Sequence, residues 1–268
     1  MWKSSHAFGE YRVKVCGDCG LGCLEGMLPE PEVLYRLGYF ASNDCACGYA
    51  AYAELEPALR RTMGARLARI GRYMAERGRL LDVGCGLGGG LAVAEERGWV
   101  AEGLEVAAET VAWLRERGYR VHCGRIEQFA EREAYDCITM WDTLEHVTDP
   151  AAAVEACAGA LRPGGILALT TGDRGSVCAR VSGRRWHLYN IPEHRFFFTR
   201  AALLALLARA RLKVLQVRHV GSWYPLNYLS ERLERKYHIR VGVPKAWRRY
   251  QLYVNLYDII ELHARKAG

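Results

Sequence analysis

One stretch, residues 80–105 (LLDVGCGLGGGLAVAEERGWVAEGLE), constrains the fold more than any other part of the chain. It predicts a strand, a glycine loop, a short helix ending near Gly98 and a second strand that stops at Glu105. Glycine at a strand-to-helix turn lets the backbone approach a ligand closely, because no Cβ collides with it. An acid about twenty residues after the first glycine is placed to accept hydrogen bonds from a ribose. The stretch therefore predicts a nucleoside-containing cofactor.

The glycines alone leave two nucleoside cofactors open. Gly84, Gly86 and Gly89 also match the G-x-G-x-x-G pattern of dinucleotide-binding turns. Asp82 separates the two readings, because its carboxylate would repel the pyrophosphate of NAD at the helix N-terminus. S-adenosylmethionine (SAM) has no phosphate, and a nearby acid favours its sulfonium and ammonium groups. We therefore predict SAM as the cofactor.

The order of motifs along the chain resembles that of the class I SAM-dependent methyltransferases. The D-x-G-x-G-x-G loop is followed by YDCITMWDTLEHVTDP (135–150), which resembles the family's fourth strand, and by LRPGG (161–165), which resembles the turn before its fifth. The segment WHLYNIPEHRFFFT (186–199) is similar to the small-molecule subgroup that includes ubiquinone-type and sugar methyltransferases. The resemblance covers roughly residue 15 to the C-terminus. It implies methyl transfer to the oxygen, nitrogen or carbon of a small-molecule acceptor.

The same resemblance implies an α/β fold with a Rossmann-like, doubly wound, mostly parallel seven-stranded sheet. We predict the methyltransferase domain over residues 58–268, with an insertion at 221–249 before a last strand near 253–262. Residues 1–57 are rich in Cys, Gly, Tyr and Pro and are expected to form a small Cys-rich cap. The helix before the glycine loop carries one apolar stripe for packing on the sheet, made by Leu59, Met63, Leu67, Ile70 and Met74.

The predicted cofactor contacts follow the ends of the strands. Trp141 and Asp142 come at the carboxyl end of the fourth strand, where open α/β sheets bind ligands, although Trp141 could equally pack under the next helix. The resemblance places the adenine beside the backbone of Ile126. The full predicted set is Asp82, Gly84, Cys85, Gly86, Gly88, Glu105, Val106, Ile126, Trp141 and Asp142.

Three residues are candidates for catalysis, if the acceptor must lose a proton. His146 has an intrinsic pKa suited to taking a proton at neutral pH. The resemblance puts the PEH segment over the methyl donor, which adds His194 and Tyr189. The long irregular stretch 172–198 that holds them is read as the acceptor-binding segment. The alternatives are that His146 shapes the pocket, that His194 is an internal hydrogen-bonding group, and that the aromatic residues anchor the loop.

The ten cysteines raise the question of a metal. The CGDCG segment at 16–20 resembles a zinc knuckle, in which small residues let backbone amides turn toward thiolates. We predict a structural zinc site of Cys16, Cys19, Cys45 and Cys47, against the alternative of free cysteines in a substrate-binding cap. The second, upstream C-x-x-C pair of methyltransferases with a zinc ribbon is absent.

Charge and hydropathy bear on partners and location. The net charge of +7 comes mostly from Arg, which suits an anionic or carrier-linked acceptor and equally a basic solvated surface. No apolar run is long enough to cross a bilayer, and the N-terminus lacks the apolar region of a signal peptide. We therefore predict a cytoplasmic protein without a membrane partner. In the family that the chain resembles, an insertion such as 221–249 can form an oligomer contact, so a homodimer is a further expectation.

Two other functions compete with small-molecule methylation. The positive charge and the knuckle suggest nucleic-acid modification, but the N/D-P-P-Y type tetrad of base-methylating enzymes and a recognisable RNA-binding module are missing. The glycine pattern suggests an NAD(H)-dependent oxidoreductase, which conflicts with Asp82. We therefore expect a small-molecule acceptor and no nucleic-acid partner.

Overall fold

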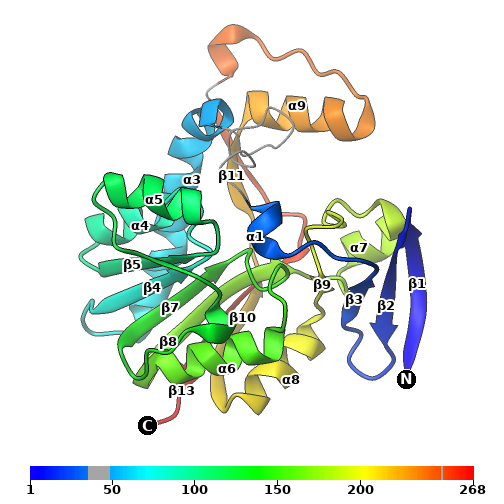
Figure 1. The fold of residues 1–268 in the computed structure, drawn as a ribbon. Helices are drawn as coiled ribbons and strands as arrows, with labels where there is room; N and C mark the ends of the chain where they lie inside the picture. The colour runs from blue at the N-terminus through cyan, green and yellow to red at the C-terminus, as the bar shows by residue number, and fades with distance from the viewer. Residues whose placement is uncertain (36–48, 249) are drawn as a thin grey trace.

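Seven strands form the central sheet in the part of the chain that the structure describes (Figure 1). The structure is a computed structural model and describes residues 1–35, 49–248 and 250–268. The strands are β4 (Arg79–Val83), β5 (Val100–Glu105), β6 (Val121–Cys123), β7 (Tyr135–Trp141), β8 (Leu161–Gly172), β10 (Leu212–His219) and β13 (Ile259–Lys266). Their order is β10-β13-β8-β7-β4-β5-β6. β13 pairs antiparallel with β8 and with β10. The pairs β4–β5, β4–β7, β5–β6 and β7–β8 are parallel. The predicted mostly parallel α/β sheet is confirmed.

Helices cover both faces of this sheet, because alternate residues of a strand point to opposite sides. In β4, Leu81 and Val83 pack in a core with α6 (Pro150–Ala160) and α8 (Arg200–Arg209). Leu80 packs on the other face, in a core with α3 (Tyr49–Ile70), α4 (Gly89–Glu96) and α5 (Ala108–Glu116). The arrangement is a three-layer sandwich with the carboxyl ends of the parallel strands along one edge.

Two helices begin where local chemistry places their caps. Asp149 accepts hydrogen bonds from the backbone N–H groups of Ala151 and Ala152, and Pro150 occupies the first helical position of α6. The hydroxyl of Thr199 accepts from the backbone N–H of Ala202 at the start of α8. Thr199 is therefore the N-cap of α8.

A second, four-stranded antiparallel sheet contains the N-terminus. Its order is β1 (Trp2–Phe8), β2 (Tyr11–Cys16), β3 (Gly22–Glu25) and β9 (Phe196–Phe197). β9 belongs to the long stretch 172–198, so this stretch completes the N-terminal sheet. That stretch also contains α7 (Val177–Ser182) and a short 3-10 helix, η3 (Gly183–Arg185). The division between cap and domain at residue 57 stays a prediction, and α3 runs across that position.

The segment after β10 forms a small unit of its own. β11 (Ser222–Pro225) pairs with β12 (Gln251–Val254), and α9 (Leu226–Tyr237) and η4 (Lys245–Trp247) lie between them in the chain. The unit contacts α3, where the backbone N–H of Trp223 donates to the Thr62 hydroxyl at 3.0 Å. The last strand of the main sheet therefore begins at Ile259, and the prediction that it starts near Tyr253 is wrong, because Tyr253 pairs with Trp223 in β12.

Within the described residues, none of the helices combines the length and the apolar character that crossing a bilayer requires.

Candidate cofactor and acceptor site

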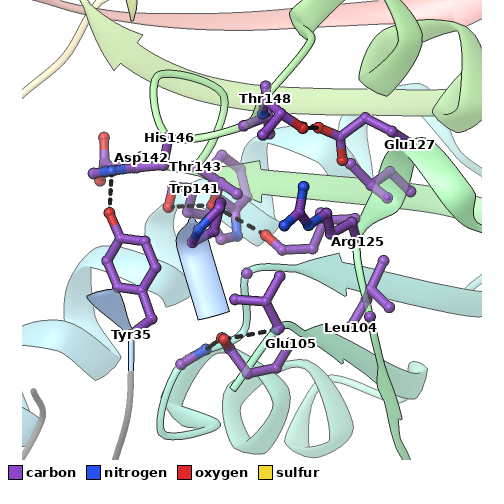
Figure 2. Close-up of a pocket in the computed structure, with 18 residues that line it drawn as sticks. Tyr35, Leu104, Glu105, Arg125, Glu127, Trp141, Asp142, Thr143, His146 and Thr148 are labelled. Atoms are coloured by element: carbon purple, nitrogen blue, oxygen red, sulfur yellow. Dashed lines mark hydrogen bonds between the residues drawn. The ribbon is translucent and has the colours of Figure 1, made fainter. Parts of the chain in front are cut away.

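A cavity of about 230 Å³ opens at the carboxyl ends of β4, β5 and β7 (Figure 2). Parallel strands of an open sheet bring their carboxyl ends together at one edge, which is where ligands of such folds bind. Most of the predicted cofactor residues line it, whereas Asp82, Cys85 and Gly88 do not. The predicted residues in the lining are Gly84, Gly86, Glu105, Val106, Ile126, Trp141 and Asp142, and His146 lines it as well.

The glycine loop after β4 lies against the turn after β7. Gly84 has a φ of +72°, and a Cβ there would lie 2.7 Å from the side chain of Thr143. The Thr143 hydroxyl donates to the carbonyl of Val83 at 3.0 Å and so ties the two turns together. Gly88 is the left-handed N-cap of α4, and Cys85 is buried beside Gly103. Gly88 and Cys85 therefore shape the glycine loop without lining the cavity.

Glu105 presents its carboxylate to the cavity (Figure 2). Its Oε2 accepts from the backbone N–H of Gly86 at 3.1 Å, and its Oε1 accepts from Val106 at 2.9 Å and from Ala107 at 3.2 Å. Burial raises the pKa of this carboxyl, and the three N–H donors oppose the rise. A carboxylate has about four lone-pair positions, so Glu105 keeps acceptor capacity for a ligand hydroxyl.

Asp82 lies beneath the glycine loop. Its Oδ1 accepts from the Thr139 hydroxyl at 2.6 Å, and its Oδ2 would lie 2.6 Å from a Cβ on Gly90 in the first turn of α4. Burial raises the pKa of Asp82 to about 7, against the lowering effects of the Thr139 hydrogen bond and the Arg66 charge. Asp82 therefore lies next to the cavity without lining it.

Asp142 holds a backbone conformation that is uncommon outside glycine, with a φ of +52°. Thr170 supports it, because the Asp142 N–H donates to the Thr170 carbonyl at 3.1 Å and the Thr170 hydroxyl donates to Asp142 Oδ1 at 2.9 Å. Such conformations cluster at ligand-binding sites. The turn places both Trp141 and Asp142 in the lining of the cavity.

Arg66 of α3 lies beside the cavity residues Trp141 and Asp142, and the sequence reasoning missed it. It is 2% exposed, with its Nη2 3.5 Å from Asp142 Oδ2 and its guanidinium carbon 5.1 Å from the centre of the Trp141 ring. Its Nε and Nη1 have no hydrogen-bond partner among the described residues. Buried donors without a partner are costly, so this guanidinium is suited to an anionic ligand group. The available signal was a charge on the apolar helix stripe, since Arg66 lies between Met63 and Ile70 at helical spacing.

The end of the cavity expected to hold the adenine is formed by the turn after β6. Ile126 is buried there, at the start of the 3-10 helix η2 (Ile126–Gln128). Glu127 Oε1 accepts from the backbone N–H of Thr148 at 2.9 Å and from its hydroxyl at 2.6 Å. The turn after β6 is thereby fixed to the segment after β7.

Arg125 lines the cavity next to Ile126 and pairs with the N-terminal segment. It donates to Glu32 Oε1 and Glu30 Oε2, at 2.6 Å each. These ion pairs hold α1 (Pro31–Leu34) at the rim of the cavity, where Pro31 and Tyr35 join the lining. The N-terminal segment is therefore part of the site.

His146 lies opposite Tyr35 (Figure 2). The Tyr35 hydroxyl is 2.6 Å from His146 Nδ1, which is also 2.9 Å from the carbonyl oxygen of Glu193. A carbonyl only accepts, so the ring proton is on Nδ1 whenever this second bond forms, and Nε2 is left as an acceptor. Burial lowers the pKa of His146 to about 4, against the effects of the Glu193 carbonyl and Asp142. The imidazole is therefore neutral at pH 7.

The two other predicted catalytic residues are placed differently. The His194 ring packs edge-on against the His146 ring, with centres 4.6 Å apart. Tyr189 lies outside the cavity lining and packs with Phe8, Trp186 and Phe197 in the core of the N-terminal sheet. The structure thus brings His146 and His194 together and leaves Tyr189 in the cluster that anchors the long stretch.

Half of the predicted zinc site can be described. Cys16 ends β2 and Cys19 lies in the turn before β3, and the backbone N–H of Cys19, followed by that of Asp18, lowers the pKa of the Cys16 thiol. A lowered thiol pKa suits a metal ligand. Cys45 and Cys47 lie outside the described residues.

A parallel sheet, a glycine turn and an acid facing the cavity define a Rossmann-like protein that binds a nucleoside cofactor. The sequence profile of the family described as "Methyltransferase domain" matches residues 55–217, from α3 into β10. The chain therefore belongs to the methyltransferase domain family, within the class I SAM-dependent methyltransferases.

Individual relatives agree with this assignment. The chain is 33% identical to the ubiquinone biosynthesis O-methyltransferase of Xanthomonas oryzae pv. oryzae over 178 residues, 59% of this chain and 73% of that protein. It is 33% identical to the protein of the same name from Idiomarina loihiensis over 150 residues, 50% of this chain. The match spans 61% of the length of the Idiomarina protein. A SAM-dependent methyltransferase from Archaeoglobus fulgidus shares the fold, with a TM-score of 0.56 and 16% identity over 81% of this chain and 99% of that one.

Proposed function

We propose that the protein transfers the methyl group of SAM to a hydroxyl group of a small-molecule acceptor. The observation that carries the proposal is the Glu105 carboxylate, which faces the cavity between the glycine loop and the ends of β5 and β7. The choice of a hydroxyl acceptor is supported by the O-methyltransferase names of the relatives. The net charge of +7 is compatible with an acceptor that carries negative charge.

The residues present fit SAM at both ends. Glu105 would accept from the ribose hydroxyls, and the buried Ile126 would lie beside the adenine. The partnerless Nε and Nη1 of Arg66 would receive the methionine carboxylate. When bound, SAM supplies a methyl group made electrophilic by its sulfonium. Asp82 and Asp142 place negative charge near that cation.

The acceptor side of the site is proposed at Tyr35 and His146. Positioning an acceptor oxygen within attack distance accounts for much of the catalysis in such a transfer. Tyr35 and His146 line the cavity together with Trp141. We assign His146 Nε2 as the atom that takes the acceptor proton, with the Nδ1 bond to the Glu193 carbonyl holding the ring in place.

Binding and turnover assays test the proposal. Calorimetry should detect binding of SAM and S-adenosylhomocysteine and no binding of NADH. Release of S-adenosylhomocysteine should depend on an acceptor from a panel of phenols, catechols and sugars.

Tight binding of NADH without affinity for SAM would instead assign an oxidoreductase. Steeply salt-dependent gel shifts with RNA would assign a nucleic-acid substrate. The homodimer and the cytoplasmic location stay predictions.

The two ends of the cofactor can be tested separately at Arg66. Arg66→Gln should weaken binding of S-adenosylhomocysteine by about 30-fold, because a charge-assisted bond to its carboxylate is lost. Binding of 5′-methylthioadenosine, which lacks the amino-acid portion, should change less than about threefold. Calorimetry with both ligands measures the contrast. Arg72→Gln, an exposed arginine beyond the end of α3, is the matched control. Equal losses for both ligands would contradict the assignment.

The buried carboxyls predict a pH-dependent preference for the charged cofactor. Burial raises the pKa of Asp82 to about 7, and burial followed by the Asp142 charge raises that of Glu145 to about 8. Raising the pH from 6 to 7.5 therefore ionises most of Asp82 but only a minor fraction of Glu145, and it adds negative charge near the proposed position of the sulfonium. The affinity for SAM relative to S-adenosylhomocysteine, which has no sulfonium, should rise about three- to tenfold over that range.

Asp82→Asn should flatten this pH dependence. Asp136→Asn is the control, because Asp136 accepts from the backbone N–H of Arg79 at the opposite ends of β4 and β7. A ratio of the two dissociation constants that does not change with pH in the wild-type protein would refute the electrostatic role of these carboxyls.

A further inference from the structure

Three potential metal ligands converge at the base of the stretch 172–198, outside the cofactor cavity. Cys178 is in the first turn of α7, His187 follows η3, and Asp258 directly precedes β13. One ligand atom from each, a sulfur, a nitrogen and an oxygen, lies within 4.8 Å of the other two. Asp258 is buried, whereas Cys178 and His187 are partly exposed and give access from solvent.

We propose that Cys178, His187 and Asp258 bind a zinc ion. Thiolate, imidazole and carboxylate are the ligands that zinc takes in proteins, and the thiolate disfavours magnesium and calcium. When the ion binds, the Cys178 thiol releases its proton to solvent. The thiolate and the Asp258 carboxylate then balance the two positive charges of the ion, which lowers the cost of holding it in a partly buried place. Three protein ligands leave the fourth position to water.

The surroundings of Asp258 fit an oriented ligand. The indole Nε1 of Trp186 donates to Asp258 Oδ2 at 2.8 Å, and His187 Nδ1 lies 3.4 Å from the same oxygen. Trp186 is itself fully buried, so the carboxylate is held in one orientation. Hydrogen bonds of this kind to metal-binding carboxylates are a regular part of metal sites.

A zinc ion here would fasten α7 and η3 to the start of β13. The same stretch continues to His194 and to β9, which completes the N-terminal sheet. The site would thus hold the proposed acceptor-binding segment through residues outside the cavity lining.

Metal binding to the full chain tests this site apart from the predicted knuckle. The background is Cys16→Ser/Cys19→Ser/Cys45→Ser/Cys47→Ser, which removes the four thiols of the predicted knuckle. After treatment with a chelator and desalting, this variant should bind one equivalent of zinc in competition with a chromophoric chelator. Cobalt in place of zinc should give a thiolate-to-metal charge-transfer band with the intensity of one thiolate. Adding Cys178→Ser should abolish the band and weaken zinc binding more than about tenfold.

Cys123→Ser in the same background is the matched control, because Cys123 is exposed and lies at the end of β6. A second measurement needs no new variant: zinc should slow tryptic cleavage after Arg180, Arg184 and Arg185. A charge-transfer band that survives Cys178→Ser, or zinc that leaves this cleavage unchanged, would overturn the proposal. Circular dichroism verifies that each variant is folded.

Discussion

Glu105→Gln should raise the dissociation constants of SAM and S-adenosylhomocysteine by about 100-fold, because two charge-assisted bonds to the ribose are weakened by about 1.5 kcal/mol each. Glutamine has the same length, but its amide has one oxygen in place of two. That oxygen can still accept from Val106 and Ala107, whereas the Gly86 N–H loses its acceptor. Calorimetry on the purified variant measures the change, and a melting curve verifies the fold.

The chain offers a matched control on the same strand. Glu102 is also buried in β5, but its carboxylate binds Arg79, His122 and Tyr135 and lies outside the cavity. Glu102→Gln should lower the melting temperature and leave cofactor affinity within a factor of about two. If Glu105→Gln bound SAM as tightly as the wild-type protein, the ribose assignment would be wrong.

His146→Gln should lower kcat by about 100-fold or more, because glutamine has no ring nitrogen to take the acceptor proton. Cofactor affinity should stay nearly unchanged, since the assigned role is with the acceptor. The active form is the neutral imidazole, and its pKa of about 4 lies below the ordinary value of 6.5. Activity should therefore persist as the pH falls to about 5 and decline as it passes through 4. Steady-state kinetics over that range measure both effects.

His122→Gln is the control for His146, since His122 lies on β6, 3.1 Å from Glu102, and does not line the cavity. His194→Gln and Tyr189→Phe belong in the same series. Tyr189 is partly buried against the core of the N-terminal sheet, so its variant should affect stability more than turnover. Unimpaired turnover after replacement of all three residues would rule out a base from the protein.

The agreement between sequence and structure is closest where the determining contacts are local. The strand, turn and helix from Leu80 onward follow from apolar runs and from Gly84, whose φ of +72° few other residues adopt. Glu105 ends β5 and binds the N–H of Gly86, only 19 residues earlier. Such spacings stay within one β-α-β unit, so they can be read from the chain directly.

Contacts between distant segments could not be read in the same way. Tyr35 reaches His146 across 111 positions, and Arg125 reaches Glu30 across 95. β9 was hidden in the stretch 172–198, because a two-residue strand has no periodic pattern and exists only by pairing with β3. Arg66 gave a weak signal, a charge on an apolar helix stripe, whose meaning depends on Trp141 and Asp142 beside it.

The residues 80–105 by themselves indicated a β-α-β unit and a nucleoside cofactor, because glycine conformation, strand patterning and the spacing to Glu105 are properties of a short chain segment. The tertiary structure alone decided which groups surround that cofactor. It put Asp82 beneath the glycine loop, set the buried guanidinium of Arg66 beside Trp141 and Asp142, and placed α1 at the rim of the cavity. Those placements depend on the packing of helices and sheets far apart in the chain, which no local pattern records.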